Sequence, residues 1–192
     1  MKIIGILLIV GLIVPTTCAG AGIQNKGTTN TLSSQDERLD QFSRLGFDSL
    51  WLWGENTMTA QAFRPKLPTL SRIELGLTSY SNSANGTFIV SIRDSLDGQD
   101  LTAKNVSMKE VHAHTVGWVS IDFQDIQVTP NKRYFIVVTY DYYHYLEWCT
   151  ARWNPYHRGM PWAYTTYPEP SWDLAYGIKF PDLSFRTYGI PG

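Results

Sequence analysis

Aromatic and hydrogen-bonding side chains are interleaved between residues 142 and 172, in the last third of the chain. The ring of a Trp or Tyr can stack on the apolar C–H face of a sugar, while nearby Asn and Arg side chains bond its hydroxyl groups. A closed core would not need this mixture, so we expect an exposed binding surface. The residues that we predict to form it are Trp148, Arg152, Trp153, Asn154, Tyr156, Trp162 and Trp172.

Prolines interrupt this aromatic stretch, and they favour loops over regular strands. They are Pro155, Pro161, Pro168 and Pro170. Because loops on a rigid scaffold commonly carry binding residues, we expect the aromatic surface to lie on loops. An alternative is that several of the rings close the open ends of the fold or cover the edges of its sheets.

Three aspartates surround the glycine at position 98, and their carboxylates could supply oxygen ligands to Ca²⁺. They are Asp94, Asp97 and Asp100. The spacing differs from that of an EF-hand loop, and we expect a calcium ion here to be structural. Since aspartate is also favoured in turns, where its side chain bonds the local backbone, a simple turn is the alternative interpretation.

Carboxylates within and beside the aromatic stretch are the candidates for catalysis. Glu147, Glu169 and Asp173 could in principle provide the acid and the nucleophile of a glycoside hydrolase. The sequence has no nucleophile-elbow, phosphate-binding or dinucleotide-binding motif. We therefore predict a protein without catalytic activity and keep a glycoside hydrolase as the minor alternative.

Length and composition suit one domain with a substantial core, since the chain has 192 residues and is 43% hydrophobic. The formal net charge is -1, from 16 Lys and Arg residues and 17 Asp and Glu residues. Nucleic-acid binding normally leaves a basic surplus, so we do not expect a nucleic-acid partner. The two cysteines, Cys18 and Cys149, leave no disulfide framework for the mature domain.

The N-terminus resembles a secretory signal peptide, with Lys2, an apolar run over residues 3–14, Pro15 and then small residues. The apolar run is too short for a membrane-spanning helix. We predict a signal peptide over residues 1–21, with an N-terminal anchor as the alternative, a flexible spacer over residues 22–35 and a folded domain over residues 36–192. The protein would then be secreted or displayed at the cell surface. It would meet a membrane only through an uncleaved or lipidated N-terminal segment.

Two short patterns, beginning at Asn85 and Asn105, match the acceptor for N-glycosylation. Both lie in predicted loops. Modification at these sites would suit an exported surface glycoprotein.

The elements that must position these residues have the patterns of short β-strands. Residues 70–77 and 88–93 alternate apolar and polar side chains, which is the period of a half-buried strand. Further β-branched or aromatic runs cover residues 49–53, 58–64, 118–123, 133–140 and 182–189. Residues 101–116 are expected to form loops with a short strand near Val106 or Val111, and residues 36–44 fit either a helical or an extended segment.

Short strands separated by turn residues, without a long helical period, predict an all-β fold. We expect an antiparallel β-sandwich. A jelly roll is favoured over an immunoglobulin fold because the sequence has no Cys…Trp…Cys arrangement.

A further pattern runs through residues 60–63, 70–75, 90–101, 134–137 and 182–189, with Trp118 and the pair 122–123. This pattern resembles a widespread, uncharacterised β-sandwich domain of exported microbial surface proteins, which is similar in layout to jelly-roll carbohydrate-binding modules. The resemblance covers nearly all of the chain after the spacer. It implies a sandwich and surface display, and it carries over no activity and no catalytic residues.

We therefore predict a non-catalytic extracellular module that binds a glycan or polysaccharide, or mediates adhesion, through its aromatic surface. The alternative is a structural protein of the cell envelope that uses the same surface to contact another surface protein. No cofactor is expected apart from the structural calcium considered above.

Overall fold

The computed structural model describes residues 36–46, 48–51, 57–81, 86–140, 146–151, 155–166, 169–175 and 182–192, with the backbone alone for residues 48–51. The chain divides into one unit of residues 1–32 and a second unit of residues 33–192. The predicted signal peptide (1–21) and spacer (22–35) lie outside the described residues. The fold below is that of the second unit. No helix in its described part has the length and hydropathy needed to cross a lipid bilayer.

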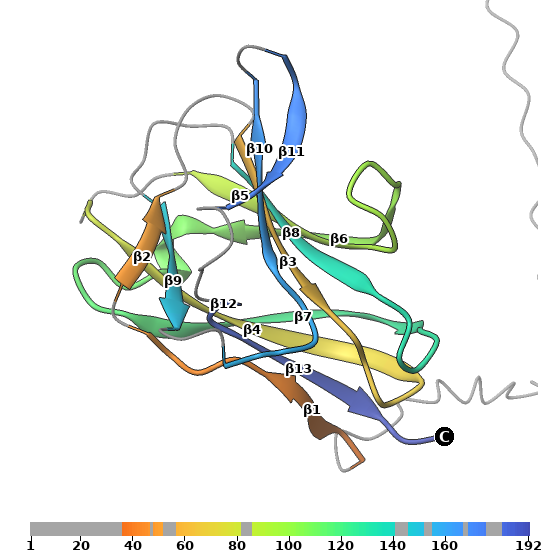
Figure 1. Cartoon of the computed structure of the whole chain (residues 1–192). Helices are drawn as coiled ribbons and strands as arrows, with labels where there is room; N and C mark the ends of the chain where they lie inside the picture. The colour runs from red at the N-terminus through yellow and green to blue at the C-terminus, as the bar shows by residue number, and fades with distance from the viewer. Residues whose placement is uncertain are drawn as a thin grey trace, which may run out of the picture. The chain divides into compact units, whose positions relative to one another are not determined.

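Two antiparallel β-sheets pack against each other as a sandwich (Figure 1), so the all-β prediction is confirmed. The seven-stranded sheet contains β1 (Arg38–Phe42), β2 (Asp48–Trp51), β4 (Thr69–Ser79), β7 (Gly117–Gln127), β9 (Leu146–Ala151), β12 (Asp182–Leu183) and β13 (Phe185–Ile190). The six-stranded sheet contains β3 (Thr57–Phe63), β5 (Thr87–Arg93), β6 (Asp100–Ser107), β8 (Tyr134–Tyr140), β10 (Pro161–Thr165) and β11 (Ser171–Leu174). A 3₁₀ helix, η1 (Met108–Glu110), follows β6.

Strand β4 organises the seven-stranded sheet. One of its edges pairs with β7, and the other pairs first with β13 and then, through its last residues, with β9. In the six-stranded sheet the order is β11, β10, β3, β8, β5 and β6. Figure 1 shows the tip of the β10–β11 hairpin projecting beyond the neighbouring strands of this sheet.

The alternating patterns of β4 and β5 direct their apolar side chains between the sheets, as predicted. Each of these side chains is at most 1% exposed: Ile73, Leu75, Leu77, Phe88, Val90 and Ile92. They belong to one core cluster that is contributed by both sheets. Full burial of such a side chain contributes about 1.5–3 kcal/mol to folding, so this cluster is the main support of the sandwich.

Leu70 is out of phase with the alternation of β4, yet it is only 1% exposed. The pairing of β4 with β7 shifts register between Leu70 and Arg72. Such a β-bulge inserts one residue and resets which face the next side chain meets. The bulge therefore returns Leu70 to the core.

The predicted strand 182–189 is interrupted at Ser184 and forms β12 and β13. The Ser184 N–H donates to the main-chain oxygen of Cys149 on β9 at 2.7 Å, and its own oxygen accepts from the N–H of Gly76 on β4 at 2.9 Å. Ser184 thus lies where the chain changes partner from β9 to β4. No sequence pattern marks this exchange.

The predicted strand near Val106 is part of β6, which covers residues 100–107 and is longer than expected. The prediction that the proline-containing aromatic stretch forms loops was wrong, since this stretch contains β9, β10 and β11. Pro161 is compatible with a sheet because it is the first residue of its strand, where a missing N–H is tolerated. Residues 38–42, which fitted a helix or an extended segment, form β1.

Candidate functional site

Trp148 and Tyr156 lie in the core, so their predicted exposure is wrong. Trp148 is 0% exposed, and its Nε1 donates to the main-chain oxygen of Ser184 at 2.9 Å. Tyr156 is 6% exposed, and its ring meets that of Phe185 edge to face, with 5.0 Å between centroids. Alternate side chains of β9 point to opposite sides of the sheet, and those of Leu146 and Trp148 point toward the core. The sequence did not show which of the two alternating sets would face the core.

Arg152, Trp153 and Asn154 lie outside the described residues, as does Asn85. Asn105 is exposed on β6, which is an edge strand of the six-stranded sheet rather than a loop. Glycosylation of Asn85 and Asn105 stays a prediction.

The aspartates around residue 98 pair with cations instead of converging. Asp94 Oδ2 accepts from Lys132 Nζ at 3.0 Å, and Asp100 Oδ1 accepts from Arg93 Nε at 2.6 Å. Asp97 is exposed in the turn between β5 and β6. Across the described part of the chain, no group of three or more His, Cys, Asp or Glu side chains is arranged to hold a metal ion.

The three carboxylates considered for catalysis are distributed over different elements. Glu147 is buried on β9 of the seven-stranded sheet. Asp173 lies on β11 of the six-stranded sheet, where Ser171 Oγ donates to its carboxylate at 3.3 Å. Glu169 is exposed between β10 and β11. Glu147 and the other two carboxylates are therefore carried by different sheets.

A second apolar cluster, separate from the core, lies on the outer side of the six-stranded sheet. We call this surface the open face and define it by Met58, Ala60, Ala62, Phe135, Val137, Trp162 and Trp172. Its position follows from strand alternation, because Phe63 on β3 and Tyr134 on β8 point into the core and their neighbours point outward.

Two of the predicted ligand-binding residues, Trp162 and Trp172, remain on this face and are only partly buried. Trp162 lies opposite Ala60 of β3, which in turn lies opposite Val137 of β8. Trp172 lies opposite Tyr164, with ring centroids 5.4 Å apart and an interplanar angle of 62°. The β10–β11 hairpin therefore packs Trp162 and Trp172 over small and aliphatic residues that are themselves buried, and the tryptophan rings remain partly exposed.

Two cavities open beside Trp162. One, of about 230 Å³, is lined by Ala62, Arg64, Arg133, His157, Arg158, Gly159, Met160 and Trp162. The other, of about 460 Å³, is lined by Arg64, Asp94, Ser95, Leu96, Lys132, Arg133, Phe135 and Trp162. The second volume lies within the range of small-molecule sites, and both cavities combine aromatic surface with hydrogen-bond donors.

The loop before β10 closely approaches β3 at the smaller cavity. A Cβ atom on Gly159 would lie 1.8 Å from the main-chain oxygen of Ala62, so this contact requires glycine. The N–H of Ala62 also donates to the oxygen of Met160 at 3.0 Å. These contacts hold His157 and Arg158 at the end of the open face.

A buried carboxylate lies behind this loop and connects the two sheets. Asp182 of β12 accepts from Gln61 Nε2 of β3 at 3.2 Å and from the N–H of Tyr156 at 2.7 Å. Burial raises the pKa of Asp182 to about 6, and the hydrogen bonds from Tyr156 and Gln61 only partly oppose that shift. Burial likewise raises the pKa of Tyr156.

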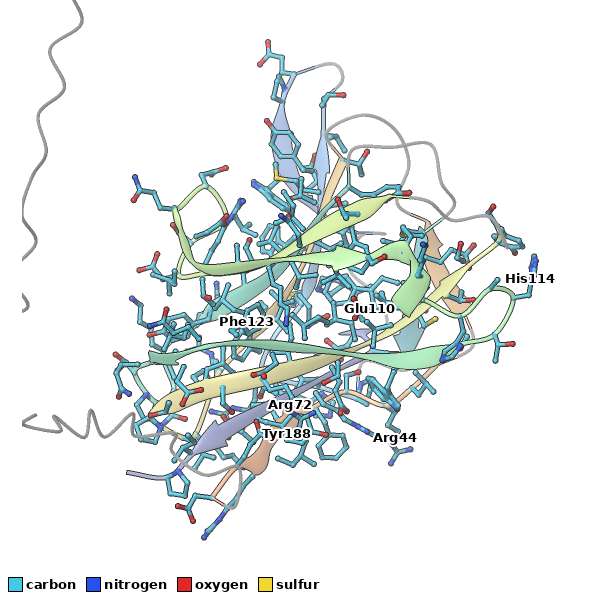
Figure 2. The ribbon with its side chains drawn as sticks, turned by 180° about the vertical axis from the view of Figure 1, so that it is seen from behind. Arg44, Arg72, Glu110, His114, Phe123 and Tyr188 are labelled. Atoms are coloured by element: carbon cyan, nitrogen blue, oxygen red, sulfur yellow. The ribbon has the colours of Figure 1, made fainter. Side chains whose placement is uncertain are left out.

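The outer side of the seven-stranded sheet has a different character. We call it the paired face and define it by Glu37, Arg72, Glu74, Trp118, Arg186 and Tyr188. Glu74 accepts from Arg72 at 2.7 Å, from Arg186 at 3.0 Å and from the Tyr188 hydroxyl at 2.9 Å. Arg72 Cζ lies 3.6 Å from the centroid of the Tyr188 ring, and Figure 2 shows these two residues together on β4 and β13.

The carboxylates of the paired face ionise more easily than usual. Partial burial raises the pKa of Glu37, but the hydrogen bonds from Arg72 and Ser71 and the charge of Arg72 outweigh it and lower that pKa. Burial is outweighed at Glu74 as well, where hydrogen bonds from Arg186, Tyr188 and Arg72 lower the pKa.

Comparisons of the chain with models of known protein families, with curated protein sequences and with solved structures find no match. The β-sandwich implied by the resemblance to exported surface domains is confirmed by the two sheets, while no family is identified.

The arginines of the open face were missed in the sequence, although strand alternation could have indicated them. Arg64 continues the outward series of Met58, Ala60 and Ala62 at every second position. Arg133 precedes the outward Phe135 by two residues. Arg158 had no such signal, because it lies in a loop whose path depends on contacts with β3.

Proposed function

We propose that this protein is an exported, non-catalytic module that binds carbohydrate on its open face. One observation carries the proposal. Trp162 and Trp172 are partly exposed on the outer side of a hydrogen-bonded sheet, and Trp162 lines two cavities whose rims carry guanidinium and ammonium donors. This arrangement supplies both parts of sugar recognition, which are a ring for stacking and donors for the hydroxyl groups.

The larger cavity offers space for a sugar ring beside Trp162. Ala60 and Val137 stand in one row with Trp162 across three adjacent strands, but both are 0% exposed, so this part of the sheet is already covered. A ring can instead lie against the exposed part of Trp162 in the cavity of about 460 Å³, where Arg64 and Arg133 can meet its hydroxyl groups.

The connectivity of the strands and the N-terminal sequence support the other parts of the proposal, which are the jelly-roll topology and export. Consecutive strands β3, β4 and β5 alternate between the two sheets, and β7, β8, β9 and β10 alternate again. Such alternation is expected of a jelly roll, and we infer that the fold belongs with the jelly-roll carbohydrate-binding modules that the sequence resembles. The signal-peptide pattern of residues 1–21 supports secretion or display at the cell surface.

The proposal is tested by screening the full chain on a glycan array and on insoluble polysaccharides, followed by Trp162→Ala. For the glycans that the wild type binds, we expect this substitution to abolish binding or to lower the affinity by about tenfold or more, as for a central aromatic contact of an interface. Trp118→Ala is the matched control, because Trp118 lies on the paired face beneath Arg186. Equal effects of the two substitutions, or retention of no glycan by the wild type, would refute the proposal.

A second candidate function is contact with another surface protein at the β5–β6 edge. Ile89 is 41% exposed and Leu101 is 45% exposed, and both belong to the strands at this end of the six-stranded sheet. Sedimentation velocity tests this candidate: ordered assembly without sugar that Ile89→Ser abolishes would favour a structural envelope role.

A further inference from the structure

Three guanidinium groups from separate parts of the chain meet at the smaller cavity of the open face. Phe63 and Tyr134 form the last pair of the β3–β8 ladder, and Arg64 and Arg133 extend outward just beyond it. Arg158 comes from the loop before β10. All three line the same cavity of about 230 Å³ together with Trp162.

Two of these arginines are oriented by neutral acceptors. Asn131, which has a left-handed backbone with φ of 66°, accepts from Arg64 Nη1 through its main-chain oxygen and from Arg158 Nη2 through Oδ1, each at 2.6 Å. Gln41 Oε1 accepts from Arg158 Nη1 at 3.3 Å. None of these partners carries a charge, so the contacts orient the two guanidinium groups and leave their charges uncompensated.

Arg133 is exposed and forms no hydrogen bond or ion pair with any residue that the structure describes. Neighbouring carboxylates have other partners. Asp94 is bound to Lys132, Asp40 accepts from the N–H groups of Lys66 and Leu67, and Asp182 is buried behind the loop. The cavity is thus a local concentration of positive charge on a protein whose formal net charge is -1.

We propose that this cavity takes the carboxylate or sulfate group of an acidic polysaccharide, with the ring that bears the group stacked on Trp162. The inference rests on the proposed carbohydrate-binding function and names its ligand class. A guanidinium group presents planar, paired N–H donors that match the two oxygens of a carboxylate or sulfate. Neutral sugars would leave the charge of Arg133 without a partner, while an acidic sugar would fill both the aromatic and the cationic part of the site.

The site is more specific than a general basic surface. Nucleic-acid binding uses an extended track of cations, whereas these arginines are gathered in one cavity beside an indole ring. An acidic peptide would supply the anion without the flat C–H face that Trp162 can stack on. The aromatic and cationic groups together therefore favour a saccharide ligand.

The test measures binding of the full chain to four polymers: polygalacturonate, carboxyl-reduced polygalacturonate, dextran sulfate and dextran. We expect polygalacturonate or dextran sulfate to bind about tenfold or more tightly than its uncharged counterpart, with affinity that falls as salt is raised. Arg133→Gln should weaken that binding by about tenfold, since it removes one charge-assisted contact. Preference for polygalacturonate would identify a carboxylate site, and preference for dextran sulfate a sulfate site.

Arg44→Gln is the matched control, because Arg44 is an exposed arginine that follows β1 of the seven-stranded sheet and is labelled in Figure 2. Equal weakening by Arg44→Gln and Arg133→Gln would overturn the inference, as would equal competition by polyglutamate. The wild type could instead bind the neutral polymers, with binding that Trp162→Ala abolishes and Arg133→Gln leaves unchanged. That result would overturn the inference of an acidic ligand and would leave the proposed carbohydrate-binding function in place. Binding to no polysaccharide, neutral or acidic, would overturn both.

Discussion

The two outer faces of the sandwich use similar residue types in opposite ways. On the paired face, every arginine has a carboxylate: Arg72 contacts Glu37 and Glu74, and Arg186 contacts Glu74. The aromatic rings there are covered as well, since Arg186 Cζ lies 4.1 Å from the centroid of the Trp118 ring. On the open face, no described residue provides a carboxylate partner for Arg64, Arg133 or Arg158, or a cation over the ring of Trp162.

This difference supports the choice of the open face in the proposed function. The paired face has satisfied its own donors and rings, so a ligand would have to displace internal contacts. The open face keeps donors and rings ready, with Asn131 and Gln41 orienting the arginines without neutralising them. Interactions that are prepared in advance cost less ordering on binding. The paired face therefore contributes to stability, and the open face is the one on which we propose that carbohydrate binds.

The largest expected effect is a loss of stability on truncation of a core residue, which tests whether the core is distinct from the two outer faces. Trp148→Ala should lower the free energy of unfolding by about 4 kcal/mol, because it opens a cavity and leaves the oxygen of Ser184 without its indole donor. Urea unfolding measures the loss, and Trp148→Phe should cost less. If Trp148→Ala leaves stability unchanged and abolishes glycan binding, Trp148 contacts the ligand and does not belong to the core.

The pH dependence distinguishes the buried carboxylate behind the open face from the carboxylates of the paired face. Asp182 has a pKa of about 6 in the folded protein against an ordinary value of 3.8, so the folded state holds its proton more tightly than the unfolded state. Stability from this group is complete below the ordinary pKa and is lost as the pH rises through about 6, a change of about 3 kcal/mol. Urea unfolding between pH 4 and pH 8 should show the decline.

Glu37 and Glu74 change stability in the opposite direction. Their lowered pKa values mean that their contribution is present above the ordinary value of 4.5 and is lost as the pH falls below it. Maximum stability is therefore expected at about pH 4.5, and stability should decline from there to about pH 6 as Asp182 ionises in the folded protein. Asp182→Asn should remove this decline between about pH 4.5 and pH 6, whereas Glu74→Gln should leave it in place. A wild-type profile that rises steadily to pH 8 would contradict the buried ionisation of Asp182.

The smallest effect tests the comparison of the two faces directly. Glu74→Gln should destabilise the protein by about 2 kcal/mol, since it weakens three hydrogen bonds and leaves Arg186 without an opposite charge. Arg133→Gln, which removes a charge with no internal partner, should change stability by no more than about 0.5 kcal/mol. Thermal melting of the two variants measures this contrast. A loss at Arg133 as large as that at Glu74 would show that the open face also contributes to stability.

Much of the fold could be predicted because half-buried strands have a period of two. Residues 70–77 and 88–93 show it, and they became β4 and β5. Alternation of apolar and polar residues is absent from strands that are buried on both sides and from exposed edge strands, so the sequence did not predict those strands well. Residues of β9 are buried on both sides, as Glu147 and Thr150 show, and β6 is an edge strand whose residues are mostly exposed. Neither strand alternates clearly, so neither was predicted in full.

The candidate site was predicted only in part for a related reason. Residue type indicated that Trp148, Tyr156, Trp162 and Trp172 could stack on a sugar, and two of these four rings lie in the core. Type alone cannot separate a ring that packs from a ring that binds. The prolines were misleading in the same way, since Pro161 begins a strand that carries Trp162 outward.

By itself, the sequence determined the all-β class, most of the strands and the presence of rings suited to sugars, because these depend on local periodicity and residue chemistry. Only the tertiary structure decided which outer face is open. That choice depends on partners far apart in the chain. Glu37 and Arg186 reach the β4 pair Arg72 and Glu74, while no carboxylate among the described residues pairs with Arg64 or Arg133. The aromatic stretch that indicated a binding surface contributes its two outward tryptophans, and two of the three arginines beside Trp162, Arg64 and Arg133, come from outside that stretch.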